Sequence, residues 1–451
     1  MSRRSRHIIK IFAKRFLIAL FHTRFGLMAR TRKRSLRAVQ LRLAFEELGA
    51  AFIKLGQLIS LRPDIIPAEY VFEMESLRDA VPSLPYEEIA AVIEADFGKS
   101  PDELFDSFEH RPIGSASIAQ VHRAMLRESY MTVFGEVLEA GASLAVKVVR
   151  PGTLEQIKQD LEIVTQQVAR LHAFKSMKRF NLPAIVNELS KSLHDECDLR
   201  NEARVSDTFA FEFRAWPHIT TAPMIWSHIS PNVLTMGFVE GYKLSESAQA
   251  EAAGVKTHFL ALHGAEVFLR QVLELGQFHG DLHQANLLMT LDSRICYIDF
   301  GITGAVALEH REAIAQVLVA TVYGDAKRAI KYSADLGLII APEKQALVEQ
   351  KMATLMTRTL GANPRDIRGF AIGFLGIMNQ ERVSIPRGFG LLIRALVVVE
   401  GCAQTVSPDI DITEAAKPYV TKLIARQMAH PARLYQRIPA AINAFLKELA
   451  G

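Results

Sequence analysis

The chain has 451 residues, of which 49% are hydrophobic and 23% are charged, so it can bury a sizeable core and is not disordered overall. Its three cysteines are too few and too scattered for a disulfide framework or a cysteine-based zinc site. The formal net charge is only +4, but Lys and Arg are dense from Arg3 to Arg42 and no acidic residue precedes Glu46.

Residues 1–45 form a basic N-terminal segment in which apolar side chains recur at helical spacing, with Lys10 and Lys14 between them: Ile8, Ile11, Phe12, Phe16, Leu20 and Phe21. A basic amphipathic helix suits the surface of an anionic membrane, with a mitochondrial targeting segment and a plain docking helix as alternatives. We expect no nucleic-acid binding, because neither a motif nor an aromatic platform accompanies the charge.

No uninterrupted apolar run approaches the roughly 18 residues that a membrane-spanning helix needs. The late run from Leu391 to Val399 is broken by Arg394. We therefore expect no transmembrane helix, and a location in the cytoplasm, peripheral to the inner membrane in a bacterium or on the matrix side of a mitochondrion.

Residues 46–108 show a helical pattern interrupted by prolines, and residues 109–240 begin with two expected strands, Ile118–Ala124 and Ser143–Val149. Helical patterns follow over Leu154–Phe174 and Leu182–Asp207, and residues 241–451 are mostly helical. The expected fold class is α+β, with a small strand-containing N-lobe and a large helical C-lobe. This is the two-lobed layout of a protein kinase.

One segment, His279–Asn286, followed by an Asp-Phe-Gly at Asp299, carries the strongest chemical signal. The spacing follows the kinase pattern in which Asp281 lies beside the attacking hydroxyl or water, while Asn286 and Asp299 hold Mg²⁺ against nucleotide phosphates. Metal ions fixed in advance stabilise the negative charge of the phosphoryl-transfer transition state. We favour this interpretation over a zinc site built from Asp281 and its flanking histidines. His279 is interpreted as a scaffold residue, and His283 has no assigned role.

Lys147 follows Ala145 and Val146 on an expected strand, where a kinase places the lysine that contacts the α- and β-phosphates. Such a lysine needs an acidic partner on a helix. Three candidates follow it in the sequence: Glu196, Asp198 and Glu202.

The segment Pro112–Gln120 occupies the position of the loop that covers the phosphates, although it is not a G-x-G-x-x-G loop. Its small residues would let backbone N–H groups approach phosphate oxygens: Gly114, Ser115, Ala116 and Ser117.

Taken together, these motifs resemble the UbiB family of atypical kinase-like proteins from about Glu47 to Cys402. Lys54, Gly56 and Gln57 look like the family's Lys-x-Gly-Gln signature, and Glu196-Cys-Asp198 looks like its Glu-x-Asp motif. The resemblance implies that Glu202 pairs with Lys147. It also implies that the helical extension bearing Lys54 and Gln57 folds over the active site and meets Glu196 and Asp198.

By this resemblance the protein is an atypical kinase or ATPase that binds ATP or ADP with Mg²⁺ and supports ubiquinone biosynthesis at a membrane surface. An isoprenoid lipid and quinone-biosynthesis enzymes are the implied partners. Two departures stand out, because the family usually has alanine at Gly114, and Gln284-Ala285 replace its Pro-Gly. The alternatives are an aminoglycoside- or choline-kinase-like phosphotransferase and a nucleotide-binding scaffold without turnover.

Overall fold

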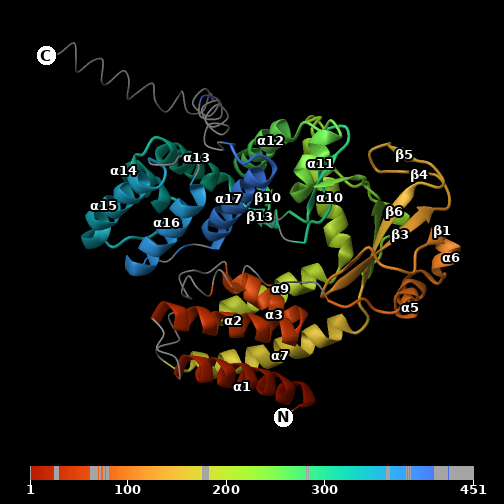
Figure 1. Ribbon diagram of the computed structural model, residues 1–451, viewed down its shortest axis with the longest axis horizontal. Coiled ribbons are helices and arrows are strands. Elements are labelled where there is room, and N and C mark those ends of the chain that lie inside the picture. The colour runs from red at the N-terminus through yellow and green to blue at the C-terminus, as the bar shows by residue number, and fades with distance from the viewer. Residues whose placement is uncertain are drawn as a thin grey trace. The chain divides into compact units, whose positions relative to one another are not determined.

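The computed structural model describes residues 2–24, 30–60, 70, 73–74, 77, 81–174, 182–280, 282, 284–301, 303–361, 366–381, 383, 385, 387–410 and 425. These residues form two compact units. The first unit comprises Met1–Val255 and Gln284–Ile302, and the second comprises Lys256–His283 and Thr303–Gly451. Helices combine with small, mostly antiparallel sheets, which confirms the α+β class (Figure 1).

The main sheet of the first unit has five strands in the order β1-β3-β6-β8, with β2 paired to β3. All of its pairings are antiparallel. The strands are β1 (Phe105–Phe108), β2 (Gly114–Ser115), β3 (Ala119–Leu126), β6 (Ser143–Val149) and β8 (Val233–Gly237). A hairpin of β4 (Tyr130–Met131) and β5 (Val137–Leu138) interrupts the connection between β3 and β6.

The two faces of β6 have different neighbours, because successive side chains of a strand point to opposite sides. Leu144, Val146 and Val148 are fully buried in a cluster with Ile89 and Ile93 of α5 (Tyr86–Phe97). Ala145 instead packs with a second cluster that includes residues of α10 (Leu199–Phe213). Lys147 therefore leaves the sheet on the side of α10.

A helical layer in the first unit is built from two parts of the sequence, one before β1 and one between β6 and β8. Its members α1, α2, α3, α7 and α9 lie side by side (Figure 1). Their bounds are α1 (Arg3–Arg24), α2 (Arg30–Leu48), α3 (Ala50–Ser60), α7 (Thr153–His172) and α9 (Leu182–Glu196). The apolar face expected for α1 is divided: Ile8 and Ile11 are buried against α2 and α3, but Phe16 and Phe21 are exposed.

The single helix expected over Leu182–Asp207 is wrong, because the structure breaks it at Cys197 and Asp198 and starts α10 at Leu199. The Asp198 side chain accepts a hydrogen bond from the Arg200 backbone N–H at 3.1 Å, and so caps α10. A capping carboxylate satisfies an amide that has no intrahelical partner, which favours a new helix start at this position.

A second sheet in the first unit has four strands in the order β7-β12-β11-β9. These are β7 (Ile219–Thr221), β9 (Gly241–Lys243), β11 (Leu287–Thr290) and β12 (Ile295–Tyr297). The hairpin β11–β12 matters most, because the two predicted metal ligands lie at its open end. Shorter helices complete the unit: α6 (Pro101–Leu104), η1 (Trp226–His228), η2 (Leu244–Glu246) and α11 (Ser247–Ala252).

In its described part the second unit is helical apart from the pair β10 (Gln277–His279) and β13 (Thr303–Ala305). Its helices are α12 (Thr257–Arg270), α13 (Leu308–Val322), α14 (Ala326–Ala334), α15 (Pro342–Arg358), α16 (Ile367–Glu381) and α17 (Arg387–Val406). A π-helical turn, η3 (Gln271–Leu275), continues α12 and ends at Gly276, whose φ is +73°. Arg311 donates to the carbonyls of Glu274 and Leu275, which fixes the entry into β10.

Candidate active site

Three charged side chains from distant parts of the sequence meet within the first unit. Lys147 Nζ of β6 lies 2.8 Å from both carboxylate oxygens of Glu202 on α10, and 3.2 Å from Oδ2 of Asp299. The sequence left Glu196, Asp198 and Glu202 as candidate partners of this lysine. Glu202 makes the contact, in the first turn of the helix that Asp198 caps.

The charge balance of this cluster keeps the lysine cationic. Burial works to lower the pKa of Lys147, but the attraction of Asp299 and Glu202 raises it above its ordinary value. For the carboxyl group of Glu202, burial has the opposite effect and raises the pKa to about 7, although the attraction of Lys147 acts to lower it. A buried ammonium group held by two carboxylates is a fixed positive charge that suits phosphate oxygens.

The phenylalanine of the Asp-Phe-Gly segment also ties this cluster to α10. The ring of Phe300 packs on Phe209 with centroids 5.1 Å apart, and Phe209 contacts Phe213 one turn further along the helix. Asp299 Oδ1 accepts the backbone N–H of Gly301 at 2.8 Å. The helix that supplies Glu202 therefore also seats the segment that supplies Asp299.

Sequence reasoning missed Phe209. The available signal was its position seven residues after Glu202, on the same face of an amphipathic helix.

Asn286 and Asp299 leave adjacent ends of the β11–β12 hairpin. Leu287 pairs with Tyr297 in that hairpin, and the Ile298 N–H donates to the Asn286 carbonyl at 3.1 Å. This backbone hydrogen bond holds the two strand ends together at the open end of the hairpin. Asn286 is buried, whereas the Asp299 side chain is 38% exposed.

An amide and a carboxylate oxygen are hard ligands of the kind that Mg²⁺ prefers, and Mg²⁺ in nucleotide sites commonly uses one or two protein ligands together with phosphate oxygens and water. Across the described residues, no group of three or more His, Cys, Asp and Glu side chains is arranged to hold a metal ion. The pair at the hairpin end therefore fits a magnesium ion that is shared with nucleotide phosphates, and does not fit a closed zinc site.

The loop expected to cover the phosphates runs along the edge of the main sheet. Gly114 and Ser115 form β2 opposite Val121 and Gln120, and the Ala116 N–H donates to the Ala119 carbonyl at 2.8 Å across a tight turn that contains Ser117. A Cβ built on Gly114 meets nothing within 4 Å, so the alanine usual in the family would fit here without strain.

Arg150 fastens this loop to the end of β6. Its guanidinium donates to Ser115 Oγ at 3.0 Å and to the Pro82 carbonyl at 3.1 Å, and its backbone N–H donates to the Ile118 carbonyl. Sequence reasoning assigned no role to Arg150. An arginine directly after the lysine strand was the available signal.

The Lys-x-Gly-Gln motif lies on α3, which contacts α2, α7 and α9. Lys54 is 7% exposed and Gln57 is half-buried. A Cβ at Gly56 would lie 2.8 Å from the Phe45 ring and 3.1 Å from the Met74 sulfur, so a larger residue there would force these side chains to shift. The motif is thus built into the helical layer of the first unit.

The acidic motif expected opposite Lys54 is only partly described. The side chain of Glu196, at the end of α9, lies outside the described residues. Asp198 is bound by Arg200, whose Nη2 lies 2.7 Å from Oδ2, and this hydrogen bond keeps the pKa of Asp198 below its usual value. The contact expected between the helical extension and these acids remains a prediction.

The rest of the catalytic segment belongs to the second unit. Asp281 and His283 lie outside the described residues. Within that unit, Phe278 and His279 of β10 are fully buried, and the His279 N–H donates to Gln271 Oε1 at 2.9 Å. The backbone that leads to Asp281 is therefore held from within its own unit.

Comparison with known proteins identifies the family of the chain. Residues 76–333, more than half of the chain, match the model of the ABC1 atypical kinase-like domain. An uncharacterized protein of Synechocystis sp., sll0005, is 29% identical over 401 residues, which is 88% of this chain and 57% of that protein. The chain thus spans little more than half the length of this relative.

Among solved structures, the complex of Rv3197 with erythromycin from Mycobacterium tuberculosis matches with a TM-score of 0.54 at 20% identity. The match covers 82% of this chain and 92% of that chain, and it supports the fold. The chain belongs to the ABC1 atypical kinase-like family of UbiB type.

Proposed function

We propose that this protein is an atypical kinase or ATPase that binds ATP or ADP with Mg²⁺ and supports isoprenoid-quinone biosynthesis at a membrane surface. The observation that carries the nucleotide part is the contact of Lys147 with both Glu202 and Asp299 in one unit. A kinase-like site requires its lysine–glutamate pair and its Asp-Phe-Gly aspartate together, and both are formed here.

Each residue of the site has a distinct task in this proposal. Lys147 binds the α- and β-phosphates, and Glu202 fixes its ammonium group in place. Asn286 and Asp299 would hold Mg²⁺, which would neutralise charge developing on the transferred phosphoryl group. Asp281 would orient the attacking hydroxyl or water and accept its proton.

The phosphate-covering loop would act through its backbone. Gly114, Ser115, Ala116 and Ser117 would present N–H groups to the phosphates, while Arg150 holds the loop on the sheet edge. Lys54 and Gln57, with Glu196 and Asp198, would form the cover that limits access to this site. A cover of this kind favours water or a small molecule over a protein as phosphoryl acceptor.

Calorimetry with Mg-ATP tests the nucleotide part. Wild-type protein should bind, and Lys147→Met should lower the affinity by about 100-fold, because a charge-assisted contact to phosphate is worth about 1.5–3 kcal/mol and the pocket loses its fixed cation. Lys99→Met, at an exposed position, is the matched control and should bind like the wild type. Absence of Mg-ATP binding by the wild type would refute the proposal.

Turnover separates the enzyme from a nucleotide-binding scaffold. Asp281→Asn should keep Mg-ATP binding and lose phosphate release, because the substitution removes the group that accepts the proton. If wild-type protein binds Mg-ATP and neither it nor Asp281→Asn supports any hydrolysis, with or without vesicles and a quinone-precursor analogue, the scaffold alternative is favoured.

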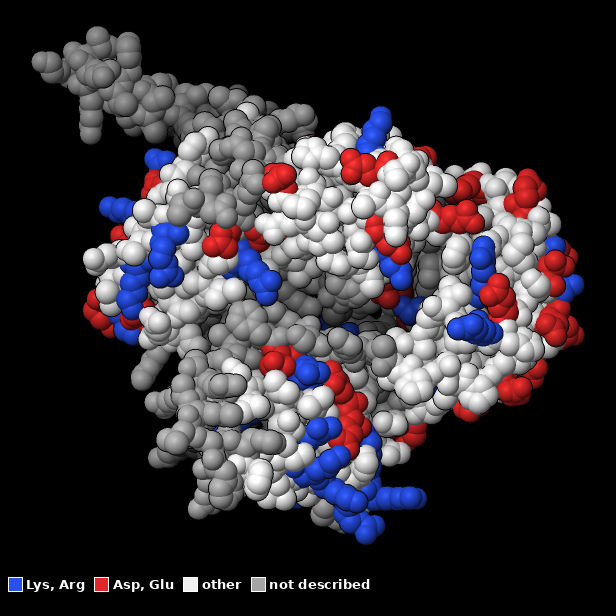
Figure 2. Space-filling model, viewed as in Figure 1, with Lys and Arg blue, Asp and Glu red and all other residues white. Residues whose placement is uncertain are grey.

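The membrane part rests on α1. This helix leaves Ile9, Phe16, Leu17 and Phe21 between 55% and 67% exposed, although other apolar residues of the same helix are buried. Figure 2 shows Lys and Arg side chains gathered over the N-terminal end of α1. Exposed apolar side chains beside basic ones suit the interface of an anionic bilayer. No helix in the described part of the chain is long and apolar enough to cross a bilayer.

Vesicle flotation tests this attachment. Replacing Phe16 and Leu17 together by Ser should lower binding to anionic vesicles, and added salt should weaken the binding of the wild type. Ile339→Ser changes an equally apolar side chain that is 84% exposed in the second unit and serves as the control. Equal binding by all three proteins would remove α1 from the membrane contact.

A further inference from the structure

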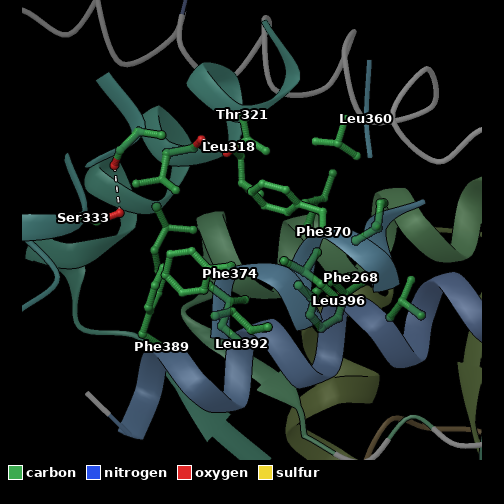
Figure 3. Close-up of a pocket in the computed structure, with 18 of the residues that line it drawn as sticks. Phe268, Leu318, Thr321, Ser333, Leu360, Phe370, Phe374, Phe389, Leu392 and Leu396 are labelled. Carbon is green, nitrogen blue, oxygen red and sulfur yellow. Dashed lines mark hydrogen bonds between the residues drawn. The ribbon is translucent and has the colours of Figure 1, made fainter. Parts of the chain in front are cut away.

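The second unit contains a cavity of about 140 Å³ among six helices, α12 to α17. Figure 3 shows Phe268, Phe370 and Phe374 around this space, together with Leu392 and Leu396 of α17. Its lining is almost wholly apolar. A close-packed interior rarely leaves a void of this size, because each missing contact weakens packing.

The two hydroxyl groups in the wall do not make the cavity polar. Ser333 Oγ donates to the Ala329 carbonyl at 2.7 Å, as Figure 3 shows, and Thr321 Oγ1 donates to the Val317 carbonyl at 2.8 Å. Both hydrogens are used within their own helices. A water molecule in a cavity needs two to four polar partners, so this wall favours a hydrocarbon over water.

One buried carboxylate lies at the end of the α17 wall. Glu400 follows the lining residue Leu396 by one helical turn, on the same stripe of the helix, and only 4% of it is exposed. Its Oε1 accepts the N–H of Ile367, another lining residue, at 3.1 Å. Its Oε2 is buried and accepts no hydrogen bond of normal geometry from the described part of the chain, although the Arg368 backbone N–H lies close enough to lower the pKa of the carboxyl group.

We propose that this cavity is a binding site for the apolar end of a small hydroxylated hydrocarbon, with Glu400 accepting a hydrogen bond from the hydroxyl group. A buried acceptor without a partner is expensive, and a ligand donor would satisfy it. The apolar wall supplies affinity for the chain, and the carboxylate supplies its orientation.

The volume limits what the site accepts. An apolar cavity of about 150 Å³ holds one benzene molecule, so this one suits a ring or a branched chain end of about five to seven carbon atoms. A longer chain would have to extend beyond the cavity. An isoprenoid chain and a straight acyl chain both have an apolar hydrocarbon end, and the two ends differ in branching.

Two contacts connect the cavity to the segment that carries Asp281. The lining residue Phe268 meets Phe278 edge-on, with centroids 6.0 Å apart, three residues before Asp281 in the sequence. On α17, Cys402 Sγ donates to the Leu282 carbonyl at 3.0 Å. An occupant of the cavity would press on both helices that hold this segment. This coupling rests on the proposed function, whereas binding itself does not.

The site is tested first without nucleotide. Met352 lies in the wall, so its ¹³C-labelled methyl group reports on occupancy. We expect saturable shifts of that signal with 3-methylbutan-1-ol, weaker shifts with pentan-1-ol if the site prefers a branched end, and equal shifts if an acyl chain fits as well. No saturable shift with either alcohol, or with benzene, would overturn the proposal.

Ala371→Leu fills the cavity from α16 and should lower alcohol affinity at least tenfold. Gly376→Ala is the matched control, because it adds a methyl group to the same helix where a Cβ meets nothing within 4 Å. Should Ala371→Leu fail to fold, Leu396→Ala enlarges the cavity and should admit larger rings. Unchanged binding in a folded Ala371→Leu protein would overturn the site.

Glu400 is tested at pH 8.5, where the carboxylate is an acceptor only. The wild type should prefer 3-methylbutan-1-ol over 3-methylbutan-2-one by about threefold to tenfold, the worth of one hydrogen bond. Glu400→Gln places an amide donor there and should remove or reverse that preference. An unchanged preference would remove Glu400 from the site.

Turnover tests the coupling. The alcohol should change the rate of Mg-ATP hydrolysis in the wild type and leave Ala371→Leu unaffected. If Met352 shifts and the protein hydrolyses ATP at an unchanged rate, the coupling is wrong. If Met352 shifts and the wild type binds no Mg-ATP, the proposed function fails and the binding site stands.

Discussion

Two buried glutamates, one in each unit, have the same displaced pKa and very different neighbours. Burial raises the pKa of both Glu202 and Glu400 to about 7. Glu202 lies 2.8 Å from Lys147, whereas no ion pair joins Glu400 to a cationic side chain among the described residues. The donors near Glu400 are the backbone N–H groups of Ile367 and Arg368 and the side-chain amide of Gln404.

The difference teaches that a displaced pKa alone does not identify the chemistry of a site. Glu202 pairs with Lys147 and so holds in place a cation that suits phosphate. Without a paired cation, Glu400 is an acceptor beside an apolar cavity, and its ionisation is a cost to the fold. Replacing Lys147, the neighbour of Glu202, should therefore lower stability, whereas removing the charge of Glu400 should raise it.

The largest expected effect comes from Lys147→Met. The substitution leaves Glu202 buried without its cation, so unfolding at pH 8 should become easier by about 3 kcal/mol, the usual loss on breaking a buried ion pair. The pKa of Glu202 should rise further. The loss should therefore shrink as the pH falls from this raised pKa toward about 7, because the carboxyl group of the variant takes up a proton before that of the wild type. Below about 7 the remaining loss should be constant.

Chemical denaturation at pH 5 and pH 8 measures this loss, and the double variant Lys147→Met/Glu202→Gln is its control. Replacing both partners removes the uncompensated charge, so much of the stability should return while Mg-ATP binding stays lost. A double variant no more stable than Lys147→Met would show that the charge of Glu202 is not the cause.

Glu400→Gln should act with the opposite sign. The folded-state pKa of Glu400 is about 7 and its ordinary value is 4.5. Between pH 4.5 and pH 7 the folded protein therefore keeps a proton on Glu400 that the unfolded chain has released. Beside the start of α16, Asp366 acts to raise this pKa and Arg368 acts to lower it, but burial is the larger cause. The contribution of Glu400 to stability therefore falls as the pH rises from about 4.5 to about 7.

The variant should match the wild type near pH 5 and be more stable by about 2 kcal/mol at pH 8. Denaturation curves at several pH values measure this difference. Asp325→Asn, which neutralises a carboxylate that is 40% exposed in the same unit, is the control and should show no such pH-dependent gain. The comparison would be contradicted if the stability of Glu400→Gln, measured relative to the wild type, were lower at pH 8 than at pH 5.

The same contrast explains what the sequence could predict. Lys147, Asn286 and Asp299 were predicted as site residues because phosphoryl transfer restricts residue types and their order, and the α+β class followed from alternating and helical periodicity. Glu400 follows an apolar run and carried no signal, since its burial depends on α16, a separate helix of the chain. The cavity is likewise a property of six packed helices, and no pattern within one helix reveals a void.

Periodicity alone was insufficient at two further places, once because of a local cap and once because of packing between helices. The helical pattern through Cys197 and Asp198 is continuous, but the capping carboxylate of Asp198 starts a new helix, which periodicity alone does not show. On α1, basic and apolar residues predicted an amphipathic helix. Which apolar residues face the protein was set by Phe45 and Phe52 of neighbouring helices.

The smallest expected effect is that of Gln404→Ala. Gln404 Nε2 donates to Glu400 Oε1 at 3.2 Å, one helical turn away, and this bond favours the ionised form of the carboxylate. Its removal should cost about 1 kcal/mol at pH 8 and less at pH 5, where Glu400 is protonated and its oxygen is a weaker acceptor. Denaturation at the two pH values measures this loss.

In a Glu400→Gln background the pH dependence of the loss should vanish, because no charge remains for the amide to stabilise. A loss of equal size at both pH values and in both backgrounds would mean that Gln404 acts by packing alone, and that Glu400 is not charged in the folded protein at pH 8.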